Sequence, residues 1–344
     1  MSRITAHSRP YDYAPAWSPN DSLLAFTCYE PSWEVILRTI GMNPPVSGDI
    51  PYNDQDAEIC LARSNGERMR LTYNRVPDYN PIWSPDGSKI AFVSQRGLGS
   101  DIYIMNSDGT DQTRLTRTGS ASDLAWSPMS DQICYRSGNY LWLVDVDTGS
   151  ERRLTNNTEV EGYPVWSPNG GTVAFLALEK NDSDWGRSQA EVRLFAFDTE
   201  EQKTLGMASP GWTLAWSSNG THLAFAGPKR EGKSPLCSID TQTLAVTQLA
   251  WDEDHIEEVI AWAVDGQHVL YATGKGVYTV RADGSGWTLV TEISDVVTFV
   301  GVHNLVLSPN EDLIALTRAE NLDVSEIWVM DLEEEVIERA SSGW

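Results

Sequence analysis

Basic residues are scarce in this sequence. Its 344 residues include 25 Lys and Arg against 49 Asp and Glu, which gives a net charge of −24 at pH 7. A protein with this charge repels polyanions over most of its surface. We therefore expect no nucleic acid among its partners.

Long hydrophobic runs are also missing. No stretch approaches the ~18 consecutive apolar residues that a membrane span requires, and the first ten residues, MSRITAHSRP, lack the apolar core of a signal peptide. We expect no membrane partner. The sequence as written predicts a cytoplasmic protein, or a periplasmic one if an N-terminal signal has been removed.

Cysteine is rare and shows no metal-binding or redox spacing. Cys28, Cys60, Cys134 and Cys237 are far apart, and each lies in an apolar run typical of a strand. This pattern predicts small buried side chains in a reducing compartment. A disulfide between Cys28 and Cys60 is the alternative, because they fall in neighbouring predicted strands.

Motifs of several enzyme classes are absent from the sequence. There is no GxSxG nucleophile elbow, no GxGxxG or GxxxxGK phosphate loop, and no HExxH zinc motif. The sequence therefore gives no support for a serine hydrolase, a nucleotide-dependent enzyme or a zincin.

Tryptophan, by contrast, is abundant and periodic. Fourteen Trp residues occur, and five belong to a repeated string, an apolar residue followed by Trp-Ser-Pro or a close variant. Two weaker copies complete a set of seven anchors: Trp17, Trp83, Trp126, Trp166, Trp216, Trp262 and Leu307. Successive anchors are 66, 43, 40, 50, 46 and 45 residues apart. A period of ~40–50 residues is typical of propeller blades.

Each repeat predicts four strands. The anchor is usually followed by a turn pair such as Asp-Gly or Asn-Gly, then by an alternating run such as Lys89 to Phe92, and later by a second hairpin. Seven four-stranded repeats predict an all-β, seven-bladed propeller that occupies residues 1–344 as one domain. The long first spacing predicts an insertion at residues 31–56, and a second lies at 179–190.

The last blade needs an outer strand to close the ring. Residues 3–6 resemble the Arg-Leu-Thr that ends two other repeats. The C-terminal segment from Glu335 to Ala340 competes for the same place beside Glu326 to Asp331. We expect the N-terminal segment to occupy it.

The repeat resembles that of a known family. The string WSPDGSKIAFVSQRGLGSDIYIMNSDGTDQTRLT, residues 83 to 116, is similar to the TolB-type propeller repeat, and the resemblance extends over about residues 3 to 340. That family includes periplasmic scaffold proteins, propeller domains of serine peptidases and a few lyases. The resemblance implies the fold and leaves the function open.

Candidate ligand-binding residues come from one end of the predicted propeller, which we call the top face. It carries the loops between second and third strands and the loops that lead into each inner strand. Aromatic rings with a few charged groups could bind a protein segment or a glycan. The candidates are Tyr79, Asp123, Tyr163, Trp185, Arg187, Trp212, Glu258 and His303. The alternative is that these rings only pack the channel mouth and that the acids are solvated.

Histidine could supply a metal site on the same face. His7, His255 and His303 fall in the approach loops of three blades that become consecutive when the ring closes, and could bind Zn²⁺ or Mn²⁺. No HxH or HxxxH spacing supports this. The Asp-rich turns between third and fourth strands indicate hairpin chemistry rather than calcium loops.

The sequence thus favours a non-catalytic binding scaffold without a cofactor. We expect a monomer. The competing hypothesis is a metal-dependent carbohydrate-active enzyme similar to a polysaccharide lyase, which would use the three histidines.

Overall fold

The computed structural model describes most of the chain. The described residues are 2–3, 12–20, 22–29, 57–63, 67–156, 159–178, 189–209, 214–228, 233–250, 256–273, 275–292, 303–321 and 324–332. Within these ranges no helix is long and apolar enough to cross a membrane.

The described strands form seven antiparallel sheets of four strands each. Blades 1 to 4 are β2 (Tyr13–Trp17), β3 (Leu24–Tyr29), β4 (Ala57–Ala62), β5 (Arg68–Arg70); β6 (Asp78–Trp83), β7 (Lys89–Ser94), β8 (Asp101–Asn106), β9 (Thr113–Arg114); β10 (Ala121–Trp126), β11 (Gln132–Ser137), β12 (Tyr140–Asp145), β13 (Glu151–Arg153); and β14 (Val160–Trp166), β15 (Thr172–Leu178), β16 (Ala190–Ala196), β17 (Glu201–Ala208). Blades 5 to 7 are β18 (Ala215–Trp216), β19 (His222–Ala226), β20 (Leu236–Asp240), β21 (Val246–Ala250); β22 (Ile256–Trp262), β23 (His268–Thr273), β24 (Gly276–Arg281), β25 (Thr288–Glu292); and β26 (His303–Leu307), β27 (Leu313–Asn321), β28 (Val324–Asp331), β1 (Ser2–Arg3).

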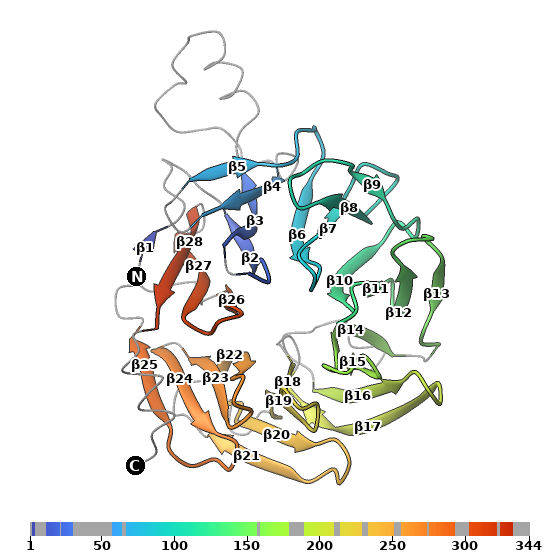
Figure 1. The fold of residues 1–344 in the computed structure, drawn as a ribbon. Coiled ribbons are helices and arrows are strands. Elements are labelled where there is room, and N and C mark those ends of the chain that lie inside the picture. The colour runs from blue at the N-terminus through green and yellow to red at the C-terminus, as the bar shows by residue number, and fades with distance from the viewer. Residues whose placement is uncertain are drawn as a thin grey trace.

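The sheets stand radially around a central axis, with the first strand of each blade innermost (Figure 1). This is the seven-bladed propeller that the repeat predicts, and each of the seven anchors ends an inner strand.

The ring closes as we expect from the sequence. Strand β1 pairs antiparallel with β28, with Ser2 opposite Val329 and Arg3 opposite Trp328. The N-terminal segment therefore completes blade 7 through Ser2 and Arg3, while residues 4–6 and the competing segment from Glu335 to Ala340 lie outside the described residues.

Four of the anchor tryptophans hydrogen-bond their blade to the one before it. The indole Nε1 of Trp126 donates to the carbonyl of Ile82, 3.2 Å away, and Trp166 donates to Ala125 at 3.0 Å. Trp17 donates across the ring closure to the carbonyl of Val306 at 3.2 Å. A backbone hydrogen bond and a large aromatic contact at the same residue explain why the repeat requires Trp there.

The turn that follows each anchor also contacts the neighbouring blade. Gly87, at a backbone φ of 72°, lies against Pro19 of blade 1, since a Cβ there would be 3.6 Å from the proline Cδ. Gly170 lies against Pro128 in the same way. The Pro and Gly of the repeated string therefore meet between blades, in addition to forming the turn.

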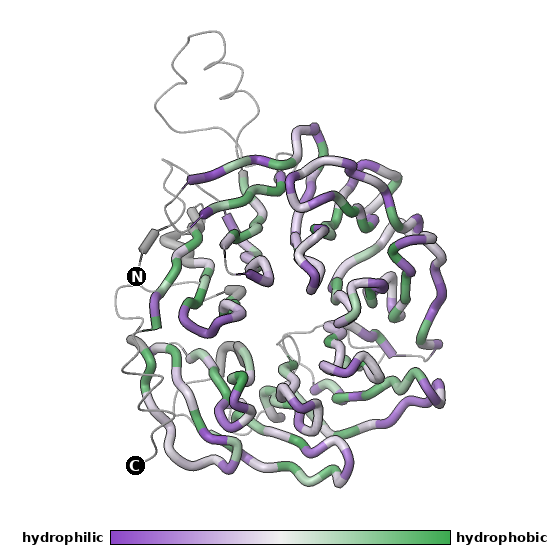
Figure 2. The backbone as a smooth tube through the Cα atoms, in the orientation of Figure 1, coloured by the Kyte–Doolittle hydropathy of each residue, from purple (hydrophilic) through white to green (hydrophobic). Residues whose placement is uncertain are grey.

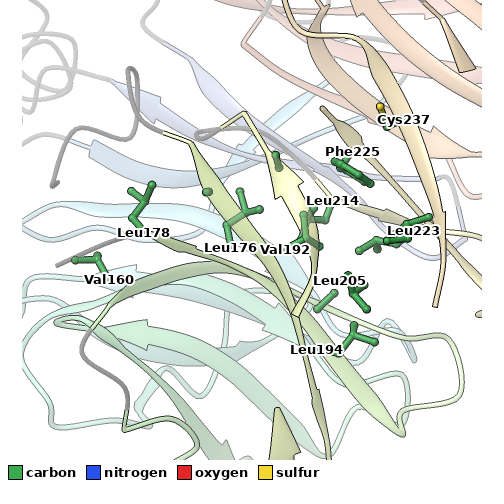
Figure 3. Packing of buried hydrophobic residues seen from close by; sticks show 14 residues of the cluster. Val160, Leu176, Leu178, Val192, Leu194, Leu205, Leu214, Leu223, Phe225 and Cys237 are labelled. Atoms are coloured by element: carbon green, nitrogen blue, oxygen red, sulfur yellow. The ribbon is translucent and has the colours of Figure 1, made fainter. Parts of the chain in front are cut away.

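The hydrophobic core is divided into clusters between adjacent blades. Figure 3 shows one of them, in which Leu176, Val192 and Leu194 of blade 4 pack with Leu223 and Phe225 of blade 5. Hydrophilic residues gather in the turns and along the outer strands (Figure 2). Because each sheet buries its faces against two neighbours, each blade depends on the adjacent blades for its stability.

The structure corrects the prediction for two cysteines. Cys28 and Cys60 form a disulfide that joins β3 to β4, whereas Cys134 and Cys237 are free and buried. The sequence pattern favours four reduced thiols because it indicates neighbouring strands but not the register that brings the two sulfur atoms together. Cys28 lies opposite Glu58 and Cys60 lies opposite Phe26, so the bridge runs diagonally between adjacent strands.

Candidate functional site

A bulge recurs near the start of the inner strands, three residues before the anchor. Ala14, Asn80, Asp123 and Tyr163 occupy this position in blades 1 to 4, and their φ angles are 54°, 53°, 51° and 54°. The strand register shifts at the same place in each of these blades. Positive φ is unfavourable for most residues other than Gly, although Asn and Asp tolerate it better, so the four blades keep an uncommon backbone geometry at the channel mouth.

The candidate residues of the top face therefore belong to strands, not to approach loops as the sequence suggested. Tyr79 lies in β6, Asp123 in β10 and Tyr163 in β14. The sequence could not show this, because a bulge breaks the alternation by which a strand is recognised.

Asp123 and Tyr163 meet at the seam between blades 3 and 4. The Asp123 carboxylate accepts a hydrogen bond from the backbone N–H of Tyr163. Nε of Arg136 lies 2.9 Å from Asp123 Oδ2 and also donates to Ser122 Oγ at 3.0 Å. The structure thus brings together two of the predicted ligand-binding residues and adds Arg136, which sequence analysis had not singled out.

Burial sets the electrostatics of this seam. It raises the pKa of Asp123, against the lowering effects of Arg136 and the Tyr163 N–H. It also raises the pKa of the Tyr163 phenol, and the nearby Asp123 charge adds to that rise. The seam therefore offers a phenol hydroxyl, a carboxyl and a guanidinium within a partly buried site, which suits directional polar recognition.

Tyr79 lies one position before the bulge in blade 2. Its hydroxyl is 3.1 Å from Ser100 Oγ, which comes from the loop between β7 and β8. Tyr79 is half-buried, so the ring packs the mouth while its hydroxyl holds a neighbouring loop.

Three other described acids of this face are buried and paired rather than solvated. Asp78, Glu58 and Asp101 are at most 1% exposed. Their partners are Arg96 at 2.5 Å, Arg70 at 2.6 Å and Arg114 at 2.6 Å, respectively. Arg70 and Arg114 are the arginines of the repeated Arg-Leu-Thr.

The threonine of the same string has a role as well. Thr72 Oγ1 and Thr116 Oγ1 each accept a hydrogen bond from a backbone N–H near the start of the third strand of their blade, from Ile59 and Ile102 respectively, both at 2.9 Å. The Arg-Leu-Thr string is therefore part of the fold, and these charges are not free to bind a ligand.

Several predicted site residues lie outside the described part of the chain. These are Trp185, Arg187, Trp212, His7 and His255, together with the insertion at 31–56 and residues 179–188 of the second insertion. Only the backbone of Glu258 and His303 is described, in β22 and at the start of β26.

The metal hypothesis stays a prediction, since its three histidines have no described side chain. The part of the chain that the structure describes contains no group of three or more His, Cys, Asp or Glu suited to a metal ion. Its two described histidines, His222 and His268, start second strands at the opposite end of the propeller, the bottom face. There they contact the turn residues Thr221 and Asp265.

Comparison with known proteins identifies the repeat. Residues 52–184 match the TolB β-propeller domain. The chain is a TolB-type β-propeller. A TolB homologue of Chlorobium luteolum is 33% identical over 135 residues, which cover 33% of this propeller and 30% of that protein. An uncharacterised protein of Agrobacterium fabrum, Atu1656, is 31% identical over 181 residues, 48% of this propeller and 60% of its own length.

These alignments span less than two thirds of either relative. Among solved structures, an oligogalacturonate lyase in complex with manganese superimposes on the TolB-type propeller with a TM-score of 0.66. That match covers 97% of this chain and 93% of the lyase at 15% identity, so it shows a shared fold.

Proposed function

We propose that this TolB-type propeller is a non-catalytic binding scaffold that holds a protein segment or a glycan at the mouth of its channel. The observation that carries the proposal is the repeated bulge. The same backbone geometry presents a different side chain in each of blades 1 to 4, from Ala14 and Asn80 to Asp123 and Tyr163. A constant backbone with variable side chains is suited to recognition, and strained positions of this kind concentrate at ligand sites.

The chemistry of the described residues supports binding over catalysis. Burial raises the pKa of the Cys134 thiol well above its usual range, which keeps it protonated and unreactive. The described histidines, His222 and His268, are engaged by turns on the bottom face, away from the Asp123 seam. The polar groups at the seam are suited to orienting a ligand.

The disulfide indicates the kind of compartment in which the scaffold functions. Disulfides persist in oxidising compartments and are rare in the cytosol. The Cys28–Cys60 bridge therefore supports a periplasmic or other oxidising location over the cytoplasmic one that the sequence suggested.

A glycan array and a phage-displayed library of random peptides would test the proposal. The wild type is compared with an Asp123→Ala, Tyr163→Ala variant and with a control, Asp108→Ala, Trp287→Ala, that changes exposed residues away from the top face. We expect selected ligands to lose at least about tenfold in affinity for the first variant and to keep it for the control. Equal binding to all three proteins would contradict the proposal. So would turnover of a bound oligosaccharide that a chelator abolishes.

A further inference from the structure

Two large apolar side chains stand out on the top face around blade 2. Leu98, in the loop between β7 and β8, has a relative exposure of 107%, and Tyr73, between β5 and β6, is 72% exposed. Arg75 and Arg117 are exposed on the same set of loops. We call Tyr73, Arg75, Leu98 and Arg117 the blade 2 patch.

Backbone hydrogen bonds tie the loops of the patch together. The backbone N–H of Gln95 donates to Pro77 O at 3.0 Å. On the other side, Ser100 N–H donates to Gly119 O at 3.1 Å, and Ala121 N–H donates to Ser100 O at 2.8 Å. Three loops that are distant in sequence therefore form one continuous support.

Buried polar groups beneath these three loops hold them in place. Asn74 Nδ2 donates to Asp78 Oδ2 at 2.6 Å and to Glu58 Oε2 at 3.3 Å. Arg96 Nη2 also donates to Asp78 Oδ2, and its guanidinium lies 5.1 Å from the ring centre of Tyr103. These bonds fix the loops, so a ligand meets a surface that is already organised.

The charge of the patch is opposite to that of the whole molecule. Three described acids near it, Glu58, Asp78 and Asp101, are buried and paired with arginines. A fourth, Glu151, accepts a hydrogen bond from the backbone N–H of Arg117 at 3.1 Å. Arg75 makes no ion pair with any described residue, and the side chain of Arg117 is also exposed. Here the surface presents guanidinium groups beside apolar area.

The turns of the opposite face carry ionised carboxylates. These turns contain Asp86, Asp108, Asp145, Asp240 and Asp283, whose pKa values are lowered by hydrogen bonds, chiefly from neighbouring Ser or Thr groups or backbone amides. These carboxylates stay ionised and repel an anionic partner. An acidic partner is therefore directed away from the bottom face and toward the blade 2 patch.

We infer that the blade 2 patch binds a protein segment that carries carboxylates beside large apolar side chains. The inference rests on the proposed function, because it names the partner of the same face. Leu98 and Tyr73 supply apolar contact area, and Arg75 and Arg117 pair with the carboxylates of the segment. A protein segment fits better than an anionic bilayer, because a bilayer presents negative charge to the whole molecule, whose net charge is −24.

The test uses random 12-residue peptides displayed on phage and selected on the full chain. A Tyr73→Ala, Leu98→Ala variant and an Arg75→Glu, Arg117→Glu variant are compared with wild type, and circular dichroism checks that each is folded. The matched control is Arg63→Glu with Met129→Ala, both exposed on the bottom face. We expect acidic peptides rich in Leu, Phe or Trp, with at least about tenfold weaker binding to either patch variant and unchanged binding to the control. Binding should weaken as salt is raised.

Charge reversal gives a second readout. Selection on the Arg75→Glu, Arg117→Glu protein should enrich basic peptides in place of acidic ones. Enrichment of basic or uncharged peptides in the selection on wild type would overturn the inference. So would a selection in which no peptide is enriched. Stronger binding to phosphatidylglycerol vesicles than to any selected peptide would also overturn it.

The two proposals fail in different ways. Peptides that lose affinity for the Asp123→Ala, Tyr163→Ala protein but bind the patch variants as tightly as wild type would refute the blade 2 patch and leave the scaffold function in place. Peptides with the reverse behaviour would support the patch and refute the channel mouth as the site.

Discussion

The hydrogen bonds of the anchor tryptophans predict that two similar substitutions have different costs. Trp126 and Trp83 are buried to the same degree, at 8% and 9% exposure, between adjacent blades. Trp126 Nε1 donates to Ile82 O at 3.2 Å, whereas Trp83 Nε1 is buried and has no hydrogen-bond partner. Replacing either with Phe removes the same atoms, so the loss of apolar volume largely cancels in the comparison.

The magnitude follows from the difference in hydrogen bonding. Trp126→Phe loses a net hydrogen-bond contribution of about 1 kcal/mol, while Trp83→Phe removes a buried unpaired N–H that costs about 1–3 kcal/mol. We therefore expect Trp126→Phe to lower the free energy of unfolding by about 2–4 kcal/mol more than Trp83→Phe.

Urea unfolding followed by circular dichroism measures both values. Trp262 provides an independent repeat, because its Nε1 is also buried without a partner and it is 7% exposed. Trp262→Phe should behave like Trp83→Phe. Equal losses at Trp126 and Trp83, or a larger loss at Trp83, would refute the reasoning.

Three further predictions concern the bulge, the disulfide and a turn. Ala14→Gly should raise the free energy of unfolding by up to about 1 kcal/mol, because Gly relieves the positive φ of 54°. Removing the disulfide with Cys28→Ala, Cys60→Ala should lower the free energy of unfolding by about 4 kcal/mol, because the two cysteines are 32 residues apart in the sequence. Thr148→Ala should raise the pKa of Asp145, measured by NMR, because Thr148 Oγ1 donates to its carboxylate at 2.6 Å.

Each of these has a control and a contradicting result. Ala16→Gly, in the same strand at an ordinary φ, should destabilise the protein by about 0.5–1 kcal/mol; stabilisation at Ala16, or none at Ala14, would contradict the first prediction. Thiol titration of the unfolded wild type should find two thiols before reduction and four after, since Cys134 and Cys237 are free. Four thiols before reduction would contradict the bridge.

The hydrogen bond from Thr148 to Asp145 also predicts how the stability of the protein changes with pH. The pKa of Asp145 is lowered from its ordinary value of 3.8 in the folded state, so its stabilising contribution is present above about pH 4 and is lost as the pH falls through the folded value. Thr148→Ala should weaken this dependence. The pKa of Asp240, which bonds to Thr243 in another blade, should not change.

The sequence was sufficient for the fold because the anchors repeat. Trp17 to Leu307 mark the inner strands, and the N-terminal segment was correctly assigned to blade 7. The chemistry of the top face was harder to predict, because Asp78 and Glu58 look like solvated acids until their arginines, Arg96 and Arg70, are brought close by strand pairing.

The seam between blades 3 and 4 shows the same limit. Asp123 and Tyr163 are 40 residues apart in the sequence. No local pattern indicates that the Asp123 carboxylate accepts a hydrogen bond from the backbone N–H of Tyr163. Arg136 comes from a second strand whose alternation looks ordinary. Contacts between blades depend on the radial packing of whole sheets, which the spacing of motifs within one repeat does not report.

The pairing of β1 with β28 also has a consequence for biosynthesis. A ribosome makes Ser2 and Arg3 long before it makes their partners, Trp328 and Val329. Blades 1 to 6 can therefore form one after another as the chain emerges, while the N-terminal strand must wait unpaired until the last blade appears. The final step of folding joins the oldest and the newest parts of the chain, so a nascent chain stalled before β28 would keep its ring open.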